Sequence, residues 1–264
     1  MIDVEEVKNF IRNSSLHKFR AKCIDGTDRV ILLKQKEKIY SAKTLLSEYL
    51  IGRLAHEFGI NAPDVSLIKM NNNLYNSLGA KRKLFDLTCN IGVASDYIEL
   101  DLPNPNEFYD FLKNNKIYSN QIYGMKLFMC WIYLGDYHKC DVLQFDQQGK
   151  LYFLDFNMAF ENRSKSYYNG SYDDIWSQLE NYNKYKIKSI LNSLDKFWNQ
   201  FPNDYSCFEK WFTKLMELDL DNFILTNTNI PKCWDVPPNY IQDILSFIFT
   251  NRERFIKEFI AAIN

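Results

Sequence analysis

The alternation of apolar and polar positions changes character once along the chain, near residue 100. Before that point, short segments with a period of two predict β-strands. The segment 19–34 contains two of them, joined at Asp25-Gly26, a dipeptide typical of a tight β-hairpin. Two further strand-like segments, 64–70 and 93–100, complete this part of the chain.

One amphipathic helix is predicted between these strands, from Ser41 to residue 60. Leu46, Leu50 and Leu54 recur at the spacing of a helical face, and Gly59 is placed to end the helix. Two strands, a helix and more strands predict a small strand-rich unit with one main helix.

After residue 100 the apolar spacing is mostly that of helices. The segment 122–135 is apolar on every side and predicts a buried helix. A second hairpin is expected where the period returns to two, with the turn DQQG between VLQF and KLYFLDF. The remaining predicted helices are 108–115, 173–201, 206–219 and 238–263. The predicted fold class is therefore α+β, with a small lobe over 1–100 and a larger, mostly helical lobe over 101–264.

The charge composition and the length of the apolar segments bear on which partners the protein can bind. The 264 residues carry 32 basic and 33 acidic side chains, a net charge of −1, which does not favour nucleic acid as a partner. The longest apolar segment, 122–135, is shorter than the roughly 20 residues of a membrane span and contains Lys126. The N-terminal segment is acidic and unlike a signal peptide, so a cytoplasmic protein without a membrane partner is expected.

Six cysteines are scattered singly. They form no CxxC pair and no Cys/His pair at zinc-binding spacing, so ordinary reduced thiols are expected.

The strongest chemical signal is a set of three aspartates beside apolar segments. Asp141 follows Asp136 by five residues, and the second hairpin then leads to Asp155 at the end of an apolar strand. In protein kinases an Asp that accepts the proton of the acceptor hydroxyl is followed by one metal ligand on the same loop and a second after a hairpin. The order predicts phosphoryl transfer, with Asp136 as the catalytic carboxylate and Asp141 and Asp155 as Mg²⁺ ligands.

The N-terminal part offers a matching cation. Lys34 ends the apolar strand RVILLK, and Glu48 lies on the predicted helix beside its apolar face. A Lys34–Glu48 ion pair would satisfy Glu48 and aim the ammonium at phosphates, as the strand lysine and helix glutamate of protein kinases do.

Five segments together resemble the HipA-like branch of the protein-kinase-like fold. They span about residues 19 to 256, and the helix segment and the tail pattern are the most specific. The segments are IDGTDRVILLK, LLSEYLIGRLAHEFGINAPDVSLI, VASDYIEL, the pair LGDYHKCDVLQF and LYFLDFNMAFE, and IPKCW followed by NRERF.

The resemblance implies a bilobal kinase fold that binds ATP and Mg²⁺, or Mn²⁺, between its lobes. It gives the roles above to Asp136, Asp141, Asp155, Lys34 and Glu48. It also implies that a hinge segment faces the adenine; this segment comprises Tyr97, Ile98, Glu99 and Leu100. The acceptor implied by toxin-type relatives is a protein Ser/Thr hydroxyl.

Three positions depart from the family pattern. Asp141 stands where Asn is usual, Tyr137 where Arg follows the catalytic Asp, and Asn157 near the expected glycine. These departures leave open a non-catalytic nucleotide-binding interaction module. A kinase acting on a small molecule or lipid is a further alternative, because no motif in the sequence identifies the acceptor.

Overall fold

The computed structural model describes most of the chain. The described residues are 1–11, 17–36, 41–99, 118–133, 143–145, 150–154, 182–199, 201–237 and 239–264. The proposed boundary near residue 100 lies outside them, so the division into two lobes stays a prediction.

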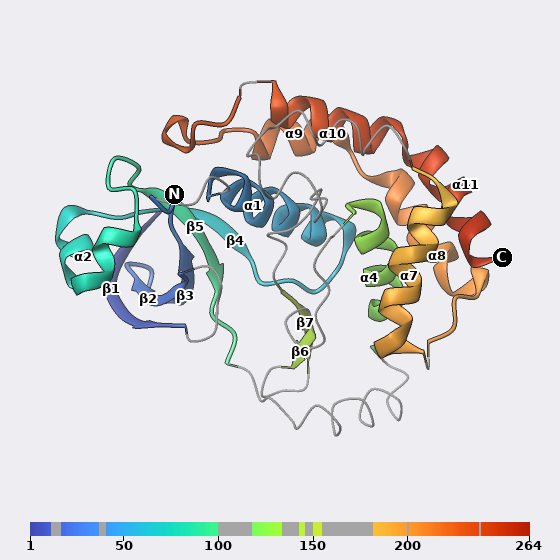
Figure 1. The fold of residues 1–264 in the computed structure, drawn as a ribbon, viewed down its shortest axis with the longest axis horizontal. Coiled ribbons are helices and arrows are strands. Elements are labelled where there is room, and N and C mark those ends of the chain that lie inside the picture. The colour runs from blue at the N-terminus through green and yellow to red at the C-terminus, as the bar shows by residue number, and fades with distance from the viewer. Residues whose placement is uncertain are drawn as a thin grey trace.

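Five strands of the N-terminal part close into a small barrel (Figure 1). The order around it is β1-β2-β3-β5-β4, and β1 closes the ring by pairing in parallel with β4. Closure leaves few unpaired strand edges among these elements. The strands are β1 (Ile2–Phe10), β2 (Phe19–Cys23), β3 (Asp28–Leu32), β4 (Val65–Lys69) and β5 (Ile91–Asp96).

The hairpin predicted within 19–34 is confirmed as β2 and β3. Gly26 adopts φ +82° at the turn, a conformation that glycine reaches without the steric cost of a Cβ. Phe19 pairs with Ile31, and both side chains are fully buried inside the barrel. Because side chains alternate along a strand, Val30 and Leu32 point to the outer face of the sheet.

Helix α1 (Ser41–Phe58) covers that outer face, against β4 and β5. A Cβ on Gly52 would lie 2.9 Å from both γ-carbons of Val65, so the helix packs directly on β4. Gly59, at φ +86°, ends the helix as expected, and its amide donates to the carbonyl of His56.

A polar segment between β4 and β5 forms a short helical cover over the barrel. It contains α2 (Asn72–Ser77) and the 3₁₀ helix η1 (Gly79–Leu84). Asn71 caps α2 by accepting from the amide of Leu74. Leu74 and Tyr75 are buried in the barrel core, which explains why this polar segment is anchored.

The C-terminal part is helical, as predicted (Figure 1). Its central helix is α4 (Ser119–Trp131), whose residues from Ile122 to Trp131 are all buried. Around it lie α7 (Lys184–Trp198), α8 (Tyr205–Glu217), α9 (Leu220–Asn227), α10 (Tyr240–Thr250) and α11 (Arg252–Ile263). The second predicted hairpin is confirmed as β6 (Leu143–Phe145) and β7 (Leu151–Phe153). No helix in the described ranges is both long and apolar enough to cross a bilayer.

One helix prediction was wrong, and one helix was missed. The segment 238–263 is two helices, because the amide and side-chain nitrogens of Asn251 both donate to the carbonyl of Phe247 and end α10 there. The following residue, Arg252, donates to the carbonyls of Leu215, Met216 and Leu218 at the end of α8, which fixes the junction. Helix α9 was not predicted at all.

Candidate functional site

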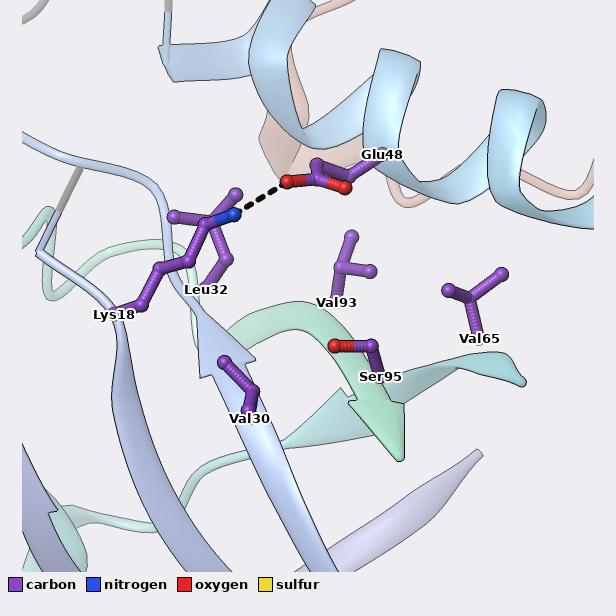
Figure 2. Close-up of a pocket in the computed structure, with 7 residues that line it drawn as sticks. All are labelled: Lys18, Val30, Leu32, Glu48, Val65, Val93 and Ser95. Carbon is purple, nitrogen blue, oxygen red and sulfur yellow. Dashed lines mark hydrogen bonds and ion pairs between the residues drawn. The ribbon is translucent and has the colours of Figure 1, made fainter. Parts of the chain in front are cut away.

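A pocket lies between the outer face of the barrel and α1 (Figure 2). The space between its lining side chains measures about 230 Å³, including space that is open to solvent. Its lining is mainly apolar, with one cation and one carboxylate; the lining residues are Lys18, Val30, Leu32, Glu48, Val65, Val93 and Ser95.

Strand register builds the floor of this pocket from cross-strand neighbours. Val30 of β3 pairs with Ser95 of β5, which pairs with Val65 of β4. The adjacent row contains Leu32 and Val93, which also pair. These side chains lie on the outer face because alternate residues fill the barrel interior. Apart from Ser95 the floor is therefore apolar, which suits the face of a flat ring.

An ion pair stands above this floor. Lys18, directly before β2, places its Nζ 2.6 Å from Oε1 of Glu48 on α1. Both side chains are largely shielded, with 17% and 13% of their surfaces exposed. A shielded pair is screened less by solvent than a surface pair, so it orients its ammonium more firmly.

The predicted Lys34–Glu48 pair is wrong. Lys34 donates instead to the carbonyl of Cys233 at 3.0 Å, and its Nζ lies 3.5 Å from Oδ2 of Asp86. Lys34 follows the last residue of β3, Leu32, by two positions, so it lies on the same face but beyond the pocket. Glu48 was correctly expected to form an ion pair with a lysine, but that lysine is Lys18, directly before β2, and not Lys34.

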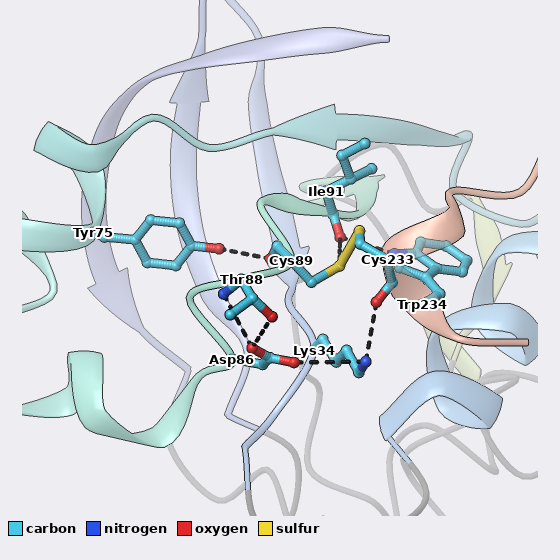
Figure 3. Close-up of a disulfide and its surroundings, with 8 residues drawn as sticks. All are labelled: Lys34, Tyr75, Asp86, Thr88, Cys89, Ile91, Cys233 and Trp234. Atoms are coloured by element: carbon cyan, nitrogen blue, oxygen red, sulfur yellow. Dashed lines mark hydrogen bonds and ion pairs between the residues drawn. A yellow bond between two sulfur atoms is a disulfide. The ribbon is translucent and has the colours of Figure 1, made fainter.

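One partner of Lys34, Cys233, belongs to a tail segment that reaches back to the barrel, whereas Asp86 lies between η1 and β5 (Figure 3). The 3₁₀ turn η4 (Lys232–Trp234) buries Trp234 completely, and the indole Nε1 donates to the carbonyl of Ile91 at 2.8 Å. Trp234 packs in one cluster with Leu32 and Val93, two residues that also line the pocket. The tail therefore supports the pocket floor from outside the site.

A disulfide joins the same tail to the barrel, between Cys89 and Cys233. The expectation of six reduced thiols is wrong at these two positions. The pairing could not be seen from spacing, since 144 residues separate the two cysteines. Cys23, Cys130 and Cys207 are free thiols, while Cys140 lies outside the described residues.

The predicted hinge segment directly follows β5. The amide of Tyr97 donates to the carbonyl of Asp28, and the guanidinium of Arg20 lies 3.8 Å from the centre of the Tyr97 ring. Ile98 is partly buried and Glu99 is exposed, whereas Leu100 lies outside the described residues. Contact of this segment with adenine stays a prediction.

Asp136, Asp141 and Asp155 lie outside the described residues, so their arrangement is untested. Among the residues that the structure describes, no group of three His, Cys, Asp or Glu side chains is placed to hold a metal ion. Mg²⁺ binding by Asp141 and Asp155 therefore stays a prediction.

The types of side chain that line the pocket suit a nucleotide. An apolar floor suits an aromatic base, and the Lys18 ammonium at its edge suits an anionic phosphate. A Lys–Glu pair between the sheet and the covering helix is also found on the phosphate side of protein kinases, although their lysine stands on the third strand.

Comparison with known proteins identifies the family to which the chain belongs. The family model described as HipA-like kinase matches residues 4–236. The chain belongs to the HipA-like kinase family. Membership in this family supports a kinase-type phosphotransferase, and the predicted resemblance is confirmed.

One solved structure supports the fold. The crystal structure of the Helicobacter pylori proinflammatory kinase CtkA matches with a TM-score of 0.59 at 11% identity, covering 99% of this chain and 96% of that one. This likeness shows a kinase-like fold. Golgi casein kinase matches less well, with a TM-score of 0.48 at 11% identity over 99% of this chain and 72% of that one. No curated protein sequence is significantly similar to this HipA-like chain.

Proposed function

We propose that the chain is an ATP-dependent phosphotransferase that phosphorylates a Ser/Thr hydroxyl of a protein. The observation that carries the proposal is the Lys18–Glu48 pair over an apolar pocket between sheet and helix, in a chain of the HipA-like kinase family. Phosphoryl transfer depends on positioning and on charge stabilisation, and this pair provides a positioned cation.

Each part of the site has a distinct task in this proposal. Val30 and Val93 offer an apolar surface to the adenine, and the segment from Tyr97 to Leu100 offers backbone groups to its edge. The glutamate holds Lys18 in place, so that little side-chain entropy is lost when the ammonium meets a phosphate. When bound, ATP supplies the phosphoryl group that is transferred.

The carboxylates expected on the other side of the cleft complete the proposal. Asp136 would orient the acceptor hydroxyl and accept its proton. Asp141 and Asp155 would hold Mg²⁺ or Mn²⁺, and their mutual repulsion is relieved when a divalent cation lies between them. A carboxylate at 141 in place of an amide makes this cation site more negative.

Tyr137 and Asp141 differ from the residues usual in the family, and this difference favours a second candidate function: a nucleotide-binding interaction module without turnover. A kinase for a small molecule or lipid would use the same residues, and the acceptor alone separates it from the first candidate.

Incubation with Mg-ATP tests the proposal, with ADP formation and phosphate incorporation into a panel of protein, small-molecule and lipid acceptors as readouts. The proposal expects turnover that falls by at least about 100-fold in Asp136→Asn, because the acceptor loses its base. Asp146→Asn, in the predicted DQQG turn, is the matched control and should keep wild-type turnover. Tight ATP binding without turnover on any acceptor would instead support the interaction module.

A further inference from the structure

We infer that the phosphate-binding lysine of this chain is Lys18, supplied by the segment that enters β2, and that the usual lysine position on the third strand is occupied by Leu32. This inference rests on the proposed function, since it assigns a residue to the phosphates of ATP.

The position of Leu32 is the first step. In protein kinases the lysine that contacts the phosphates stands on the third strand of the small lobe and pairs with a glutamate of the following helix. Here β3 is the third strand and α1 follows it. The two residues of β3 that line the pocket are Val30 and Leu32, both apolar, and Leu32 has only 4% of its surface exposed.

The register supplies the second step. Phe19 pairs with Ile31 in the β2–β3 hairpin, so the next pair outward places Lys18 across from Leu32. Directly opposed residues on one face have Cβ atoms about 5 Å apart, well within the reach of a lysine side chain. Lys18 can therefore bring its ammonium to the place that a lysine at position 32 would reach. Figure 2 shows the Lys18 side chain passing Leu32 toward Glu48.

Lys34 is the competing lysine on this face of the sheet. Lys34 is engaged with the tail and with Asp86, and Figure 3 shows its ammonium between them, beside the disulfide. Moving it to Glu48 would break the hydrogen bond to Cys233 that helps hold the tail on the barrel. Lys34 is thus a structural residue that links the tail to β3, although its strand and spacing resemble those of a phosphate-binding lysine.

Two matched substitutions separate these roles. Lys18→Met and Lys34→Met each remove one ammonium from the same face of the same sheet and keep most of the aliphatic stem. The affinity for Mg-ATP and for adenosine, which lacks phosphates, is measured by titration calorimetry. Lys18→Met should weaken Mg-ATP binding about 10- to 100-fold, as loss of a charge-assisted hydrogen bond predicts, and leave adenosine binding unchanged. Lys34→Met should change neither affinity by more than about 3-fold.

A relocation variant provides the sharpest result. Adding Leu32→Lys to Lys18→Met returns the ammonium to the third strand, where it can again meet Glu48, and should restore most of the lost Mg-ATP affinity. If Lys18→Met alone fails to fold because Glu48 loses this ion pair, Lys18→Met combined with Glu48→Gln removes both charges and supports the same comparison.

The outcomes distinguish the inference from the function on which it rests. Wild-type protein that binds neither Mg-ATP nor adenosine would overturn the proposed function and this inference together. Wild-type protein that binds Mg-ATP, with a loss in Lys34→Met and none in Lys18→Met, would overturn the inference and leave the function standing. Equal losses of ATP and adenosine in Lys18→Met would also overturn it, because that pattern indicates a structural role.

Discussion

Lys34 of the barrel donates a hydrogen bond to the carbonyl oxygen of Cys233, 199 residues later in the chain, at 3.0 Å. Together with the Cys89–Cys233 disulfide and the buried indole of Trp234, this contact fixes the tail segment on the outside of β3 and β5. Because Trp234 belongs to the same buried cluster as Leu32 and Val93, the tail stabilises residues that form the pocket floor.

Trp234→Ala should lower the free energy of unfolding by about 3–5 kcal/mol, the usual cost of deleting a fully buried aromatic side chain. Trp234→Phe keeps most of the packing and loses the hydrogen bond to Ile91, so a loss of about 1–2 kcal/mol is expected. Denaturant unfolding measures both. Leu225→Ala is the control, since that leucine is 83% exposed and its truncation should cost under about 0.5 kcal/mol. Equal stabilities of Trp234→Ala and Leu225→Ala would contradict the tail's supporting role.

Removal of the disulfide should destabilise the oxidised protein. The bond closes a loop of 144 residues, for which loss of the cross-link is expected to cost about 3–5 kcal/mol through the entropy of the unfolded chain. Cys89→Ser and Cys233→Ser should each show this loss in chemical unfolding, and Cys207→Ser, a free and half-buried thiol, should not. Alkylation of protein purified without reductant, followed by peptide mass analysis, should leave Cys89 and Cys233 unmodified; labelling of both would refute the pairing.

The helical part contains a fully buried lysine, Lys126, whose charge is compensated by Asp195. Lys126 donates to Asp195 at 2.7 Å, to the carbonyl of Phe201 at 2.6 Å and to Asn203 at 3.1 Å. Burial lowers the pKa of Lys126, and the hydrogen bond from Lys126 to Asp195 opposes that shift. Asp195→Asn removes the compensating charge and should cost about 2–3 kcal/mol of unfolding free energy.

The control for this substitution is Glu209→Gln, an equivalent change on an exposed side chain of α8. Its unfolding free energy should stay within about 0.5 kcal/mol of wild type. Matching losses in both variants would show that the charge of Asp195 does not compensate Lys126.

Asp86, beside Lys34, should titrate below the ordinary value. Hydrogen bonds from the hydroxyl and amide of Thr88, with a smaller contribution from Lys34, lower the pKa of Asp86 below 3.8. A carboxyl group with a lowered folded pKa contributes stability that is complete above pH 3.8 and is lost as the pH falls through the folded value.

Thr88→Val removes the hydroxyl donor and should move the pKa of Asp86 back toward 3.8 in an NMR titration of carboxyl carbons. Asp204, whose pKa is lowered in the same way by Ser206, is the internal control and should titrate unchanged in this variant. An unaltered Asp86 titration would exclude the Thr88 hydroxyl as the main cause.

Local features of the fold could be predicted from the sequence because they depend on neighbours in the chain. The hairpin turn at Gly26, the end of α1 at Gly59 and the buried helix α4 follow from spacing and from glycine geometry. The break between α10 and α11 at Asn251 could not be predicted in this way, because no glycine or proline marks it. The contacts of Arg252 that stabilise the break are made with the end of α8.

The candidate site could be predicted only in part for the same reason. Glu48 stands out as a charge beside an apolar helical face, but its partner is chosen by strand pairing, which brings Lys18 across from Leu32. Lys18 lies in no recognisable motif. The alternating pattern places Lys34 on the same face of the sheet as the pocket, but it does not show that Lys34 lies beyond the pocket. The tail residue that Lys34 contacts lies about 200 residues later in the chain.

A crystal structure of the chain with Mg²⁺ and a non-hydrolysable ATP analogue would show which lysine contacts the phosphates. We expect the adenine against Val30 and Val93 and a phosphate oxygen within hydrogen-bonding distance, about 3 Å, of Lys18 Nζ. An analogue bound elsewhere, or with its phosphates on Lys34 in place of Lys18, would contradict this expectation.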